Sequence, residues 1–293
     1  MKWIYGGVNL KKILKGVSRS FYLSLILLPK KVRLQMGLAF LACKAADTIA
    51  DTDLIPSAER LKLLDAYREM FGSPAEGHAA TISSSVKSQT GGSAAEYSLI
   101  QGLPALMEAL NQLSPQDRLL IQELVLELTQ GMQIDLAMKG LETEAELEQY
   151  IYYVAGCVGR FWTRMIRNHF GFAAGFGPEV EALGERLGKG LQLVNILRDL
   201  PRDVQRGRHY IPKGLELSQL SQKAKNYLAS YRPYLSYYPW YACRLKAVVR
   251  LPARLGLQTL DLLANSEEWP NPARVHKLSR RQVYQTLLRS FLE

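Results

Sequence analysis

The sequence predicts an all-α fold made of one domain, and local patterns along the chain indicate it. Apolar residues recur at steps of three and four from Lys30 to Asp51, as on the buried face of an amphipathic helix. Thr143 and Glu146 form a capping-box pattern ahead of a helix expected over Tyr150–Ile166. No alternating stretch surrounds an Asn-Gly or Asp-Gly turn, so no β-hairpin is predicted.

Further helices are expected along the rest of the chain. Ser114 and Pro115 supply a cap and a first-turn proline for a helix running towards Lys139. The others are expected from Glu181 to about Leu200, over Leu251–Leu263, and after Ser279. Pro201 lacks a backbone donor, so we expect the helix that begins at Glu181 to kink or end there.

One segment departs from the helical pattern. Residues 72–98 are rich in Gly, Ser, Ala and Thr, which predicts a flexible surface insertion. A domain boundary is the alternative, but the first 71 residues would make a poor core by themselves. We therefore predict a single domain over residues 1–293 with an insertion at 72–98.

The charge balance favours an anionic partner. The net charge is +10, which suits nucleic acid, an anionic membrane or a phosphorylated substrate. Nucleic-acid binding would favour basic residues concentrated along one helix or arm, whereas here they are spread along the chain. We therefore expect no nucleic-acid partner.

The sequence also indicates a compartment. It has no uninterrupted apolar stretch of spanning length, and its N-terminus does not resemble a signal peptide. Cys43, Cys157 and Cys243 are odd in number, far apart and set among apolar neighbours. We expect buried thiols in a reducing compartment, and hence a cytoplasmic protein.

Two pairs of aspartates carry the strongest chemical signal. Asp47 and Asp51, and again Asp199 and Asp203, stand four residues apart, which places each pair on one helix face. The chain has nine aspartates, so chance predicts roughly 0.3 such pairs. The pairs continue the apolar faces of their helices, so we expect them to point inwards, where divalent cations would offset their charge. The alternative is a solvated acidic helix end paired with neighbouring Arg and Lys.

Basic residues accompany both pairs. Lys44 precedes Asp47 by three residues, Arg198 adjoins Asp199, and Arg208 follows Asp203. Carboxylates hold a metal ion while Lys and Arg hold phosphate oxygens, so both kinds of group suit a diphosphate site. Each basic residue alone could equally be a surface charge.

In combination, these residues resemble the squalene/phytoene synthase family. The resemblance rests on four motifs in order: Ser18-Arg19-Ser20-Phe21, Lys44 to Asp51, Tyr150 to Gly159, and Gln192 to Asp203 with Gly207-Arg208 and Ile211-Pro212. The sequence departs from the squalene synthases at Lys44, where Arg is typical, and at Ala50, where an extra acid is frequent.

The resemblance implies a fold and a set of roles. The fold would be an isoprenoid synthase-type helical bundle around a central cavity, acting on prenyl diphosphates. The implied Mg²⁺ ligands are Asp47, Asp51, Asn195, Asp199 and Asp203. The implied substrate contacts are Ser18, Arg19, Ser20, Phe21, Lys44, Gln192, Arg198 and Arg208. Tyr150 would steer a proton, although core packing explains a buried tyrosine equally well.

The resemblance further implies head-to-head condensation of two farnesyl diphosphates, through presqualene diphosphate, to squalene. Squalene formation needs hydride from NADPH, for which Lys277 and Arg280 are candidate contacts. A basic surface helix is the other explanation of these two residues. Phytoene or dehydrosqualene synthesis, without reduction, is the alternative reaction.

Membrane contact is a further expectation. The sequence has no counterpart of the C-terminal anchor of eukaryotic squalene synthases, which suggests a bacterial-type enzyme. We expect peripheral contact with the inner membrane face through the basic, aromatic segment Tyr231–Arg250. The rival of another class is a basic helical adaptor for anionic membranes or nucleic acid. The sequence leaves the oligomeric state open.

Overall fold

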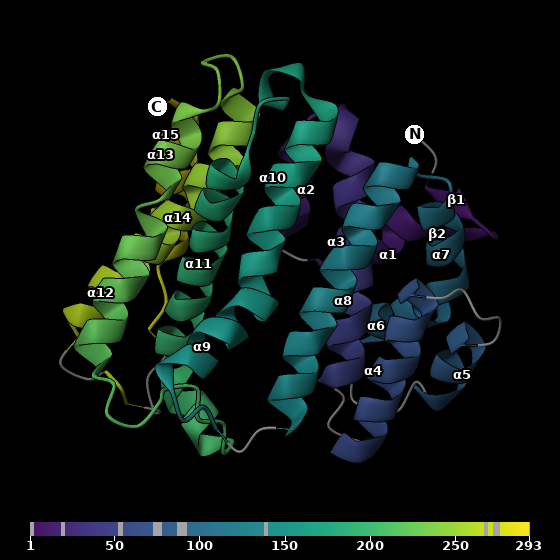
Figure 1. Cartoon of the computed structure of the whole chain (residues 1–293), viewed down its shortest axis with the longest axis horizontal. Coiled ribbons are helices and arrows are strands. Elements are labelled where there is room, and N and C mark those ends of the chain that lie inside the picture. The colour runs from purple at the N-terminus through teal and green to yellow at the C-terminus, as the bar shows by residue number, and fades with distance from the viewer. Residues whose placement is uncertain are drawn as a thin grey trace. The chain divides into compact units, whose positions relative to one another are not determined.

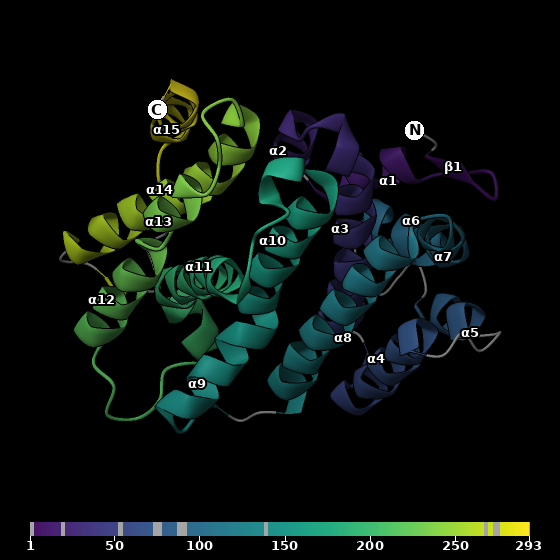
Figure 2. The same ribbon diagram turned by 45° about the horizontal axis from the view of Figure 1, so that its top comes forward.

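The computed structural model describes residues 3–18, 21–51, 55–72, 78–86, 93–137, 140–266, 269–271 and 276–292. These residues are mostly helical, with one short pair of strands, which confirms the predicted all-α class (Figures 1 and 2). The chain divides into two compact units, Met1–Ala137 (unit 1) and Met138–Glu293 (unit 2). The single domain stays a prediction. Within the described parts, no helix is both long and apolar enough to cross a membrane.

Unit 1 begins with a short hairpin that the sequence analysis missed. Strands β1 (Ile4–Tyr5) and β2 (Val8–Asn9) pair antiparallel. Gly6 and Gly7 form the turn with φ of 50° and 76°, a region open to glycine at little cost. The turn signal was Gly-Gly rather than Asn-Gly or Asp-Gly.

Helices make up the rest of unit 1. They are α1 (Leu10–Val17), α2 (Phe21–Leu27), α3 (Lys30–Ala50), α4 (Ser57–Gly72), α5 (His78–Ser85), α6 (Ala94–Gln101), α7 (Leu103–Asn111) and α8 (Pro115–Ala137). Helices α3 and α4 pack on α8, and the Tyr67 hydroxyl donates to the Ala42 carbonyl at 2.7 Å. The predicted start of α8 is confirmed, because Ser114 Oγ accepts from the Asp117 amide at 3.1 Å.

The predicted insertion at 72–98 contains ordered helical structure. Helix α5 and the first residues of α6 lie within it, and α6 starts at a full capping box between Ser93 and Glu96. Residues 73–77 and 87–92 of this segment lie outside the described residues. The flexibility of the insertion stays a prediction.

Unit 2 consists of α9 (Glu144–Ile151), a π-helical turn η1 (Tyr152–Gly156), α10 (Cys157–His169), a 3₁₀ turn η2 (Gly171–Ala173), α11 (Pro178–Gln205), α12 (Leu217–Leu228), α13 (Tyr231–Ser236), α14 (Cys243–Ala264) and α15 (Arg280–Leu292). The capping box of Thr143 and Glu146 is confirmed at the start of α9. The helix expected over Tyr150–Ile166 begins earlier, at Glu144, and the π-helical turn separates α9 from α10.

Helix α11 approaches both α10 and the π-helical turn η1 closely through glycines. A Cβ on Gly159 would overlap the Gly184 carbonyl, and one on Gly188 would overlap the Ala155 carbonyl. Such a contact leaves no room for any side chain, so helix packing accounts for these glycines.

Cysteine burial follows the expectation only in part. Cys157 is buried and Cys43 is half-buried, with a thiol whose burial, aided by the charge of Asp47, raises its pKa to about 12. Cys243, the first residue of α14, is exposed, so the expectation of a buried thiol is wrong there.

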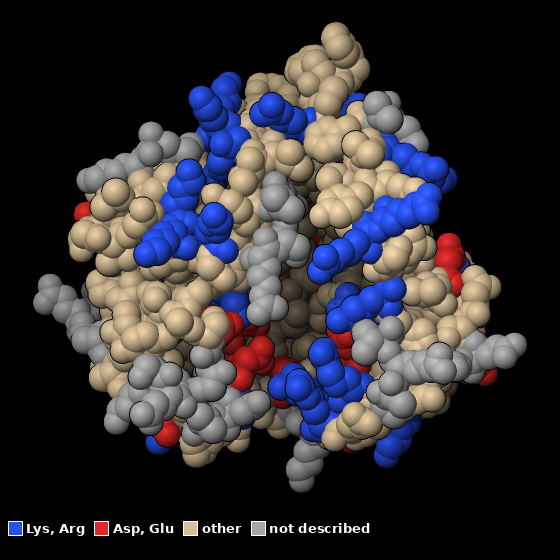
Figure 3. All heavy atoms as spheres, turned by 180° about the vertical axis from the view of Figure 1, so that it is seen from behind, with Lys and Arg blue, Asp and Glu red and all other residues tan. Residues whose placement is uncertain are grey.

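Basic side chains are spread over the face drawn in Figure 3.

Helix α11 passes through Pro201 and continues to Gln205. Of the expected kink or end at this proline, the end is therefore wrong, and the kink stays a prediction. Proline cannot donate to the carbonyl four residues earlier, which belongs to Leu197. The Trp269 indole supplies the missing donor, with Nε1 3.2 Å from the Leu197 oxygen. This tertiary hydrogen bond explains how the helix passes through a proline.

A double-mutant cycle tests this explanation. We expect Trp269→Phe to lower the free energy of unfolding by about 1 kcal/mol beyond its packing cost, because Leu197 loses its donor. In a Pro201→Ala background the alanine amide can donate to the Leu197 carbonyl. Trp269→Phe should therefore lower the free energy of unfolding by a smaller amount in that background. Urea unfolding of the four proteins measures the difference. Equal costs in the two backgrounds would contradict the explanation.

Candidate active site

The first acid pair lies at the end of α3 in unit 1. Asp47 is in the last turn, and Asp51 caps the helix with its amide donating to the Asp47 carbonyl at 2.9 Å. The Asp47 side chain keeps 41% of its surface exposed, and Asp51 is exposed. Asp47 is therefore only half-buried, and the expectation of an inward position is wrong for Asp51, because the face buried in unit 1 is formed by residues such as Leu41 and Ile49.

Lys44 links this pair to α6. Its Nζ lies 2.6 Å from Asp47 Oδ2 and 2.9 Å from Glu96 Oε1. Burial alone would raise the pKa of Glu96, but hydrogen bonds from Lys44 and the Ser93 backbone hold it at about 2. Burial lowers the pKa of Lys44, but Asp47 and Glu96 outweigh it and raise that pKa. Lys44 and Glu96 are therefore both charged near neutral pH.

Glu96 is a site residue that the sequence analysis missed. The sequence contains a pattern that could have indicated it, the capping box Ser93-x-x-Glu96, which lies inside the segment expected to be a flexible insertion. One carboxylate oxygen accepts from the Ser93 amide at 2.7 Å while the other meets Lys44. The start of α6 therefore fixes the position of the lysine beside Asp47.

The second acid pair lies near the end of α11 in unit 2. Asp199 is 23% exposed and receives two hydrogen bonds from Arg198, Nε to Oδ1 at 3.1 Å and Nη2 to Oδ2 at 2.5 Å. Burial raises the pKa of Asp199, yet Arg198 outweighs it and the net shift is downward. Asp199 is therefore ionised and held by a bidentate contact with Arg198.

Asp203 behaves differently from Asp199. Burial, and then the negative charge of Asp199, raise its pKa, while Arg202, Arg208 and Arg206 oppose the rise. The two carboxylates thus repel each other, and the nearby arginines do not cancel the effect at Asp203. A bound cation would relieve this repulsion.

A turn at Gly207 ends α11 and brings the Arg208 amide to the Asp203 carbonyl. Gly207 adopts φ of 72°, its amide donates to the Val204 carbonyl at 3.0 Å, and the Arg208 amide donates to the Asp203 carbonyl at 2.8 Å. This pair of bonds is the Schellman arrangement that closes a helix. It fixes the backbone of Arg208 beside the carbonyl of Asp203.

The donor set of unit 2 suits a magnesium ion. Asn195 is exposed one turn before Asp199, and its Nδ2 lies 3.3 Å from Gln192 Oε1. Mg²⁺ is held by one or two carboxylates and keeps waters or phosphate oxygens in its remaining positions. The negative charge of Asp199 close to Asp203 is the observation that favours such an ion. Among the described residues, no cluster of three or more His, Cys, Asp or Glu side chains forms a complete metal cage.

Tyr150 ends up in a buried aromatic pair. It is 5% exposed and stacks on Tyr210, with ring centroids 5.1 Å apart and planes 17° apart. Tyr210 follows Arg208 in the chain, and the amide of Leu141 holds the adjoining His209 carbonyl at 2.9 Å. The segment after the second acid pair is thereby packed against the end of α9.

The charge of Arg160 within α10 has a local explanation. Its guanidinium donates to the Tyr152 hydroxyl and lies 5.6 Å from the centre of that ring. Tyr152 opens the π-helical turn, and such turns are frequent at functional sites.

Comparison with known proteins decides the family. Residues 14–215 match the family model described as squalene/phytoene synthase, which covers both acid pairs and Tyr150. The chain belongs to the squalene/phytoene synthase family. The candidate NADPH contacts Lys277 and Arg280 lie outside the matched segment of this family member.

Relatives in the family carry different names. The phytoene synthase of Thermus thermophilus is 31% identical over 206 residues, which cover 70% of this chain and 59% of that protein. The presqualene diphosphate synthase of Zymomonas mobilis is 32% identical over 201 residues, 67% of this chain and 57% of that protein. The chain thus matches less than two thirds of the length of each relative.

A solved structure shows the same fold. The structure of TcSQS, a squalene synthase, with the ligand E5700 superposes with a TM-score of 0.77, covering 96% of this chain and 85% of that one. The identity is 21%, so this likeness concerns the fold alone.

The remaining predicted residues of this family member are placed as follows. Ser18 is buried and caps α1, with Oγ 2.5 Å from the Leu14 carbonyl oxygen. Arg19 and Ser20, and the side chain of Phe21, lie outside the described residues. Lys277 is exposed, and its positive charge helps to lower the pKa of Asp199. Arg280 is exposed at the first residue of α15.

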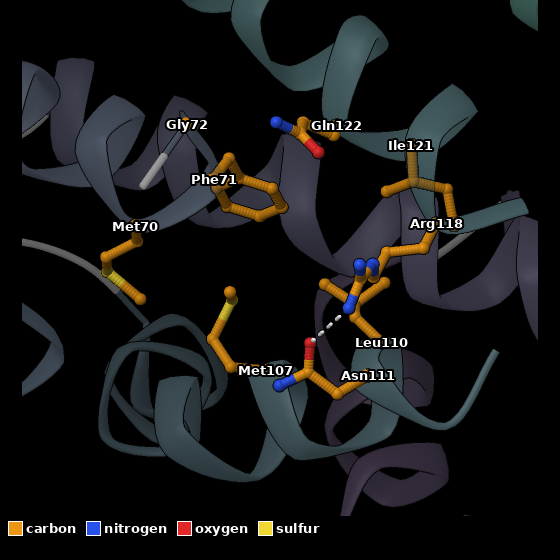
Figure 4. Close-up of a pocket in the computed structure, with 9 residues that line it drawn as sticks. All are labelled: Met70, Phe71, Gly72, Met107, Leu110, Asn111, Arg118, Ile121 and Gln122. Carbon is orange, nitrogen blue, oxygen red and sulfur yellow. Dashed lines mark hydrogen bonds between the residues drawn. The ribbon is translucent and has the colours of Figure 1, made fainter. Parts of the chain in front are cut away.

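Two cavities, one in each unit, lie away from the acid pairs. A cavity of about 230 Å³ in unit 1 is lined by Met70, Phe71 and Met107, and Arg118 donates to Asn111 at its rim at 3.5 Å (Figure 4). A hollow of about 450 Å³ in unit 2 lies between α12 and α14. Neither acid pair lines these hollows.

Substitutions at Glu96 separate its two contacts. Glu96→Gln keeps an acceptor for the Ser93 amide but removes the charge facing Lys44, so we expect a loss of about 0.5–1 kcal/mol in unfolding free energy. Glu96→Ala also loses the cap and should cost roughly 1 kcal/mol more.

The matched control is Glu69→Gln, because Glu69 is 63% exposed and pairs with His78 at 3.1 Å rather than with a lysine or arginine. Denaturant unfolding measures all three variants. A cost for Glu96→Gln no larger than that of the control would show that the Lys44 contact contributes nothing to stability.

Proposed function

We propose that this protein catalyses the Mg²⁺-dependent head-to-head condensation of two farnesyl diphosphates. One observation carries the proposal: within the family segment, each unit presents an aspartate pair with a cation bound to its first member, Lys44 at Asp47 and Arg198 at Asp199. A metal ion and a diphosphate require this combination of carboxylates and cations.

The proposed roles follow the chemistry of each side chain. Asp47 and Asp51 in unit 1, and Asn195, Asp199 and Asp203 in unit 2, would hold Mg²⁺. The metal, when bound, supplies positive charge to a leaving diphosphate. Lys44, Arg198 and Arg208, with Arg19, would orient phosphate oxygens, and Gln192 would contact substrate beside Asn195. Two of these cations already contact a carboxylate of the site, Lys44 at Asp47 and Arg198 at Asp199.

The proposed reaction proceeds by ionisation and ring closure. The C–O bond of one prenyl diphosphate breaks, and diphosphate leaves with the bonding electrons. The double bond of the second prenyl diphosphate then attacks the allylic cation to form a carbon–carbon bond. Loss of a proton closes a cyclopropane, as in presqualene diphosphate. Tyr150 is the candidate for steering that proton, supported by its burial and its fixed stacking on Tyr210.

We further propose that the cyclopropyl product is reduced by NADPH to squalene, with Lys277 and Arg280 as nucleotide contacts. A phytoene synthase that uses C20 diphosphates without reduction is the second candidate. The similarity to the Thermus phytoene synthase favours it, and dehydrosqualene would be the corresponding C15 product. A cytoplasmic location at the inner membrane face belongs to the same proposal.

Asparagine substitutions test the proposed site. We expect Asp47→Asn and Asp199→Asn each to lower turnover by at least about a hundredfold while the fold persists, because each removes a charge that would hold the metal. Asp261→Asn is the matched control, because Asp261 is 63% exposed and also pairs with a cation, Lys225 at 2.8 Å. Product formation from radiolabelled farnesyl diphosphate measures turnover, and circular dichroism checks the fold.

Normal turnover in either site variant would refute the metal assignment. A basic adaptor without enzymatic activity predicts that no product forms in the parent protein and that Mg²⁺ with a diphosphate analogue gives no thermal stabilisation.

Product analysis distinguishes the candidate reactions. We expect incubation with C15 diphosphate and Mg²⁺ to yield presqualene diphosphate, and addition of NADPH to yield squalene. Phytoene from C20 diphosphate, with no effect of NADPH, would instead identify the second candidate. Lipid extraction followed by chromatography and mass spectrometry identifies the products.

A further inference from the structure

One end of unit 2 carries exposed aromatic side chains. Tyr237, Trp240 and Tyr241 are 42%, 84% and 61% exposed, and we call these three residues the aromatic tip. They lie in and beside the loop that joins α13 to α14 (Figures 1 and 2). In Figure 3 a projection free of charged side chains stands out at the same end. Large apolar side chains at such exposure indicate an interaction surface.

The aromatic tip is held in place by rings beneath it. Phe172, from the connection between α10 and α11, contacts Tyr241 with centroids 6.5 Å apart, and Phe176 contacts Tyr237 at 6.0 Å. Below them Tyr238 is buried, and its hydroxyl bonds to that of Tyr234 at 3.0 Å. The exposed rings are therefore presented by a packed support rather than by a free loop.

All the charged residues in the sequence around the aromatic tip are basic. Between Glu216 and Asp261 the chain has seven Lys or Arg residues and no acid. Two of these cations, Arg232 and Arg244, are exposed on either side of the tip in the sequence. On the neighbouring helices, Glu181 is paired with both Arg164 and Arg167 at 2.8 Å, which leaves Glu179 as an exposed acid near this end.

We propose that the aromatic tip inserts into the headgroup region of an anionic phospholipid membrane, with Arg232 and Arg244 facing the lipid phosphates. Trp and Tyr favour this region because their rings are apolar while their N–H and O–H groups stay hydrated. Basic residues next to the membrane add attraction to anionic lipids. The proposal does not depend on the reaction that the protein catalyses.

The structure narrows the segment expected from the sequence. Of the range Tyr231–Arg250, the side chains of Tyr231, Tyr234 and Tyr238 are buried, and Arg250 is buried with Nη1 2.7 Å from the Ser290 carbonyl. These residues support the fold and are not available to lipid. The tip alone presents aromatic rings at the surface of this range.

Vesicle binding with matched variants tests the proposal. The 293-residue chain is sedimented with phosphatidylcholine vesicles that contain or lack phosphatidylglycerol. We expect binding only to the anionic vesicles, and we expect Trp240→Ser and Tyr241→Ser each to weaken it about tenfold, because each removes a large apolar group from the interface. Arg244→Gln should weaken binding less, and chiefly at low salt.

Tyr284→Ser is the matched control. Tyr284 is 62% exposed against 61% for Tyr241, but lies on α15, so its substitution should leave vesicle binding unchanged. A loss with Tyr284→Ser and none with Tyr241→Ser would assign the lipid contact to α15 and overturn the proposal. Equal binding of Trp240→Ser and the parent protein would also overturn it.

A second copy of the chain is the remaining occupant to exclude. Analytical ultracentrifugation of the parent protein and Trp240→Ser measures self-association. Self-association that Trp240→Ser abolishes, together with no vesicle binding by the parent protein, would make the tip an interface between copies and overturn the proposal. A parent protein that binds anionic vesicles as a monomer supports it.

Discussion

Electrostatic repulsion between carboxylates on one helix is the constraint from which the site follows. Aspartates four residues apart share a face, so each pair needs positive charge nearby. In both units the first aspartate has a cation, Lys44 or Arg198, in direct contact. In the second pair the nearby positive charge does not fully offset the repulsion between the carboxylates, because the pKa of Asp199 is lowered while that of Asp203 is raised. A site in this state favours further cations and, through them, phosphorylated ligands.

Features set by neighbouring residues could be predicted from the sequence. The cap at Thr143, the start of α8 at Pro115 and the extent of α3 depend on contacts within one turn, and all are confirmed. The acid pairs and their adjoining cations could be named for the same reason. The turn at Gly207 also depends on a local backbone requirement, although the sequence analysis named Gly207 only as part of a motif and predicted no turn there.

Features set by distant residues could not be predicted. The exposure of Asp51 depends on which side of α3 the rest of unit 1 covers, and periodicity alone placed it inside. Glu96 meets Lys44 from another helix, so no spacing rule connects them. The interruption of the helix at Tyr152–Gly156 and the exposure of Cys243 also arise from packing rather than from composition.

The bond from Trp269 to the Leu197 carbonyl has a consequence for how the second acid pair is built. Its two partners stand 72 residues apart in the chain. During synthesis, the turn that bears Asp199 is made well before the indole that completes its hydrogen bonding. The hydrogen bonding of α11 around Asp199 is therefore completed only when the segment that bears Trp269 packs against it. A chain truncated before Trp269 would leave the Leu197 carbonyl, next to the second acid pair, without a donor.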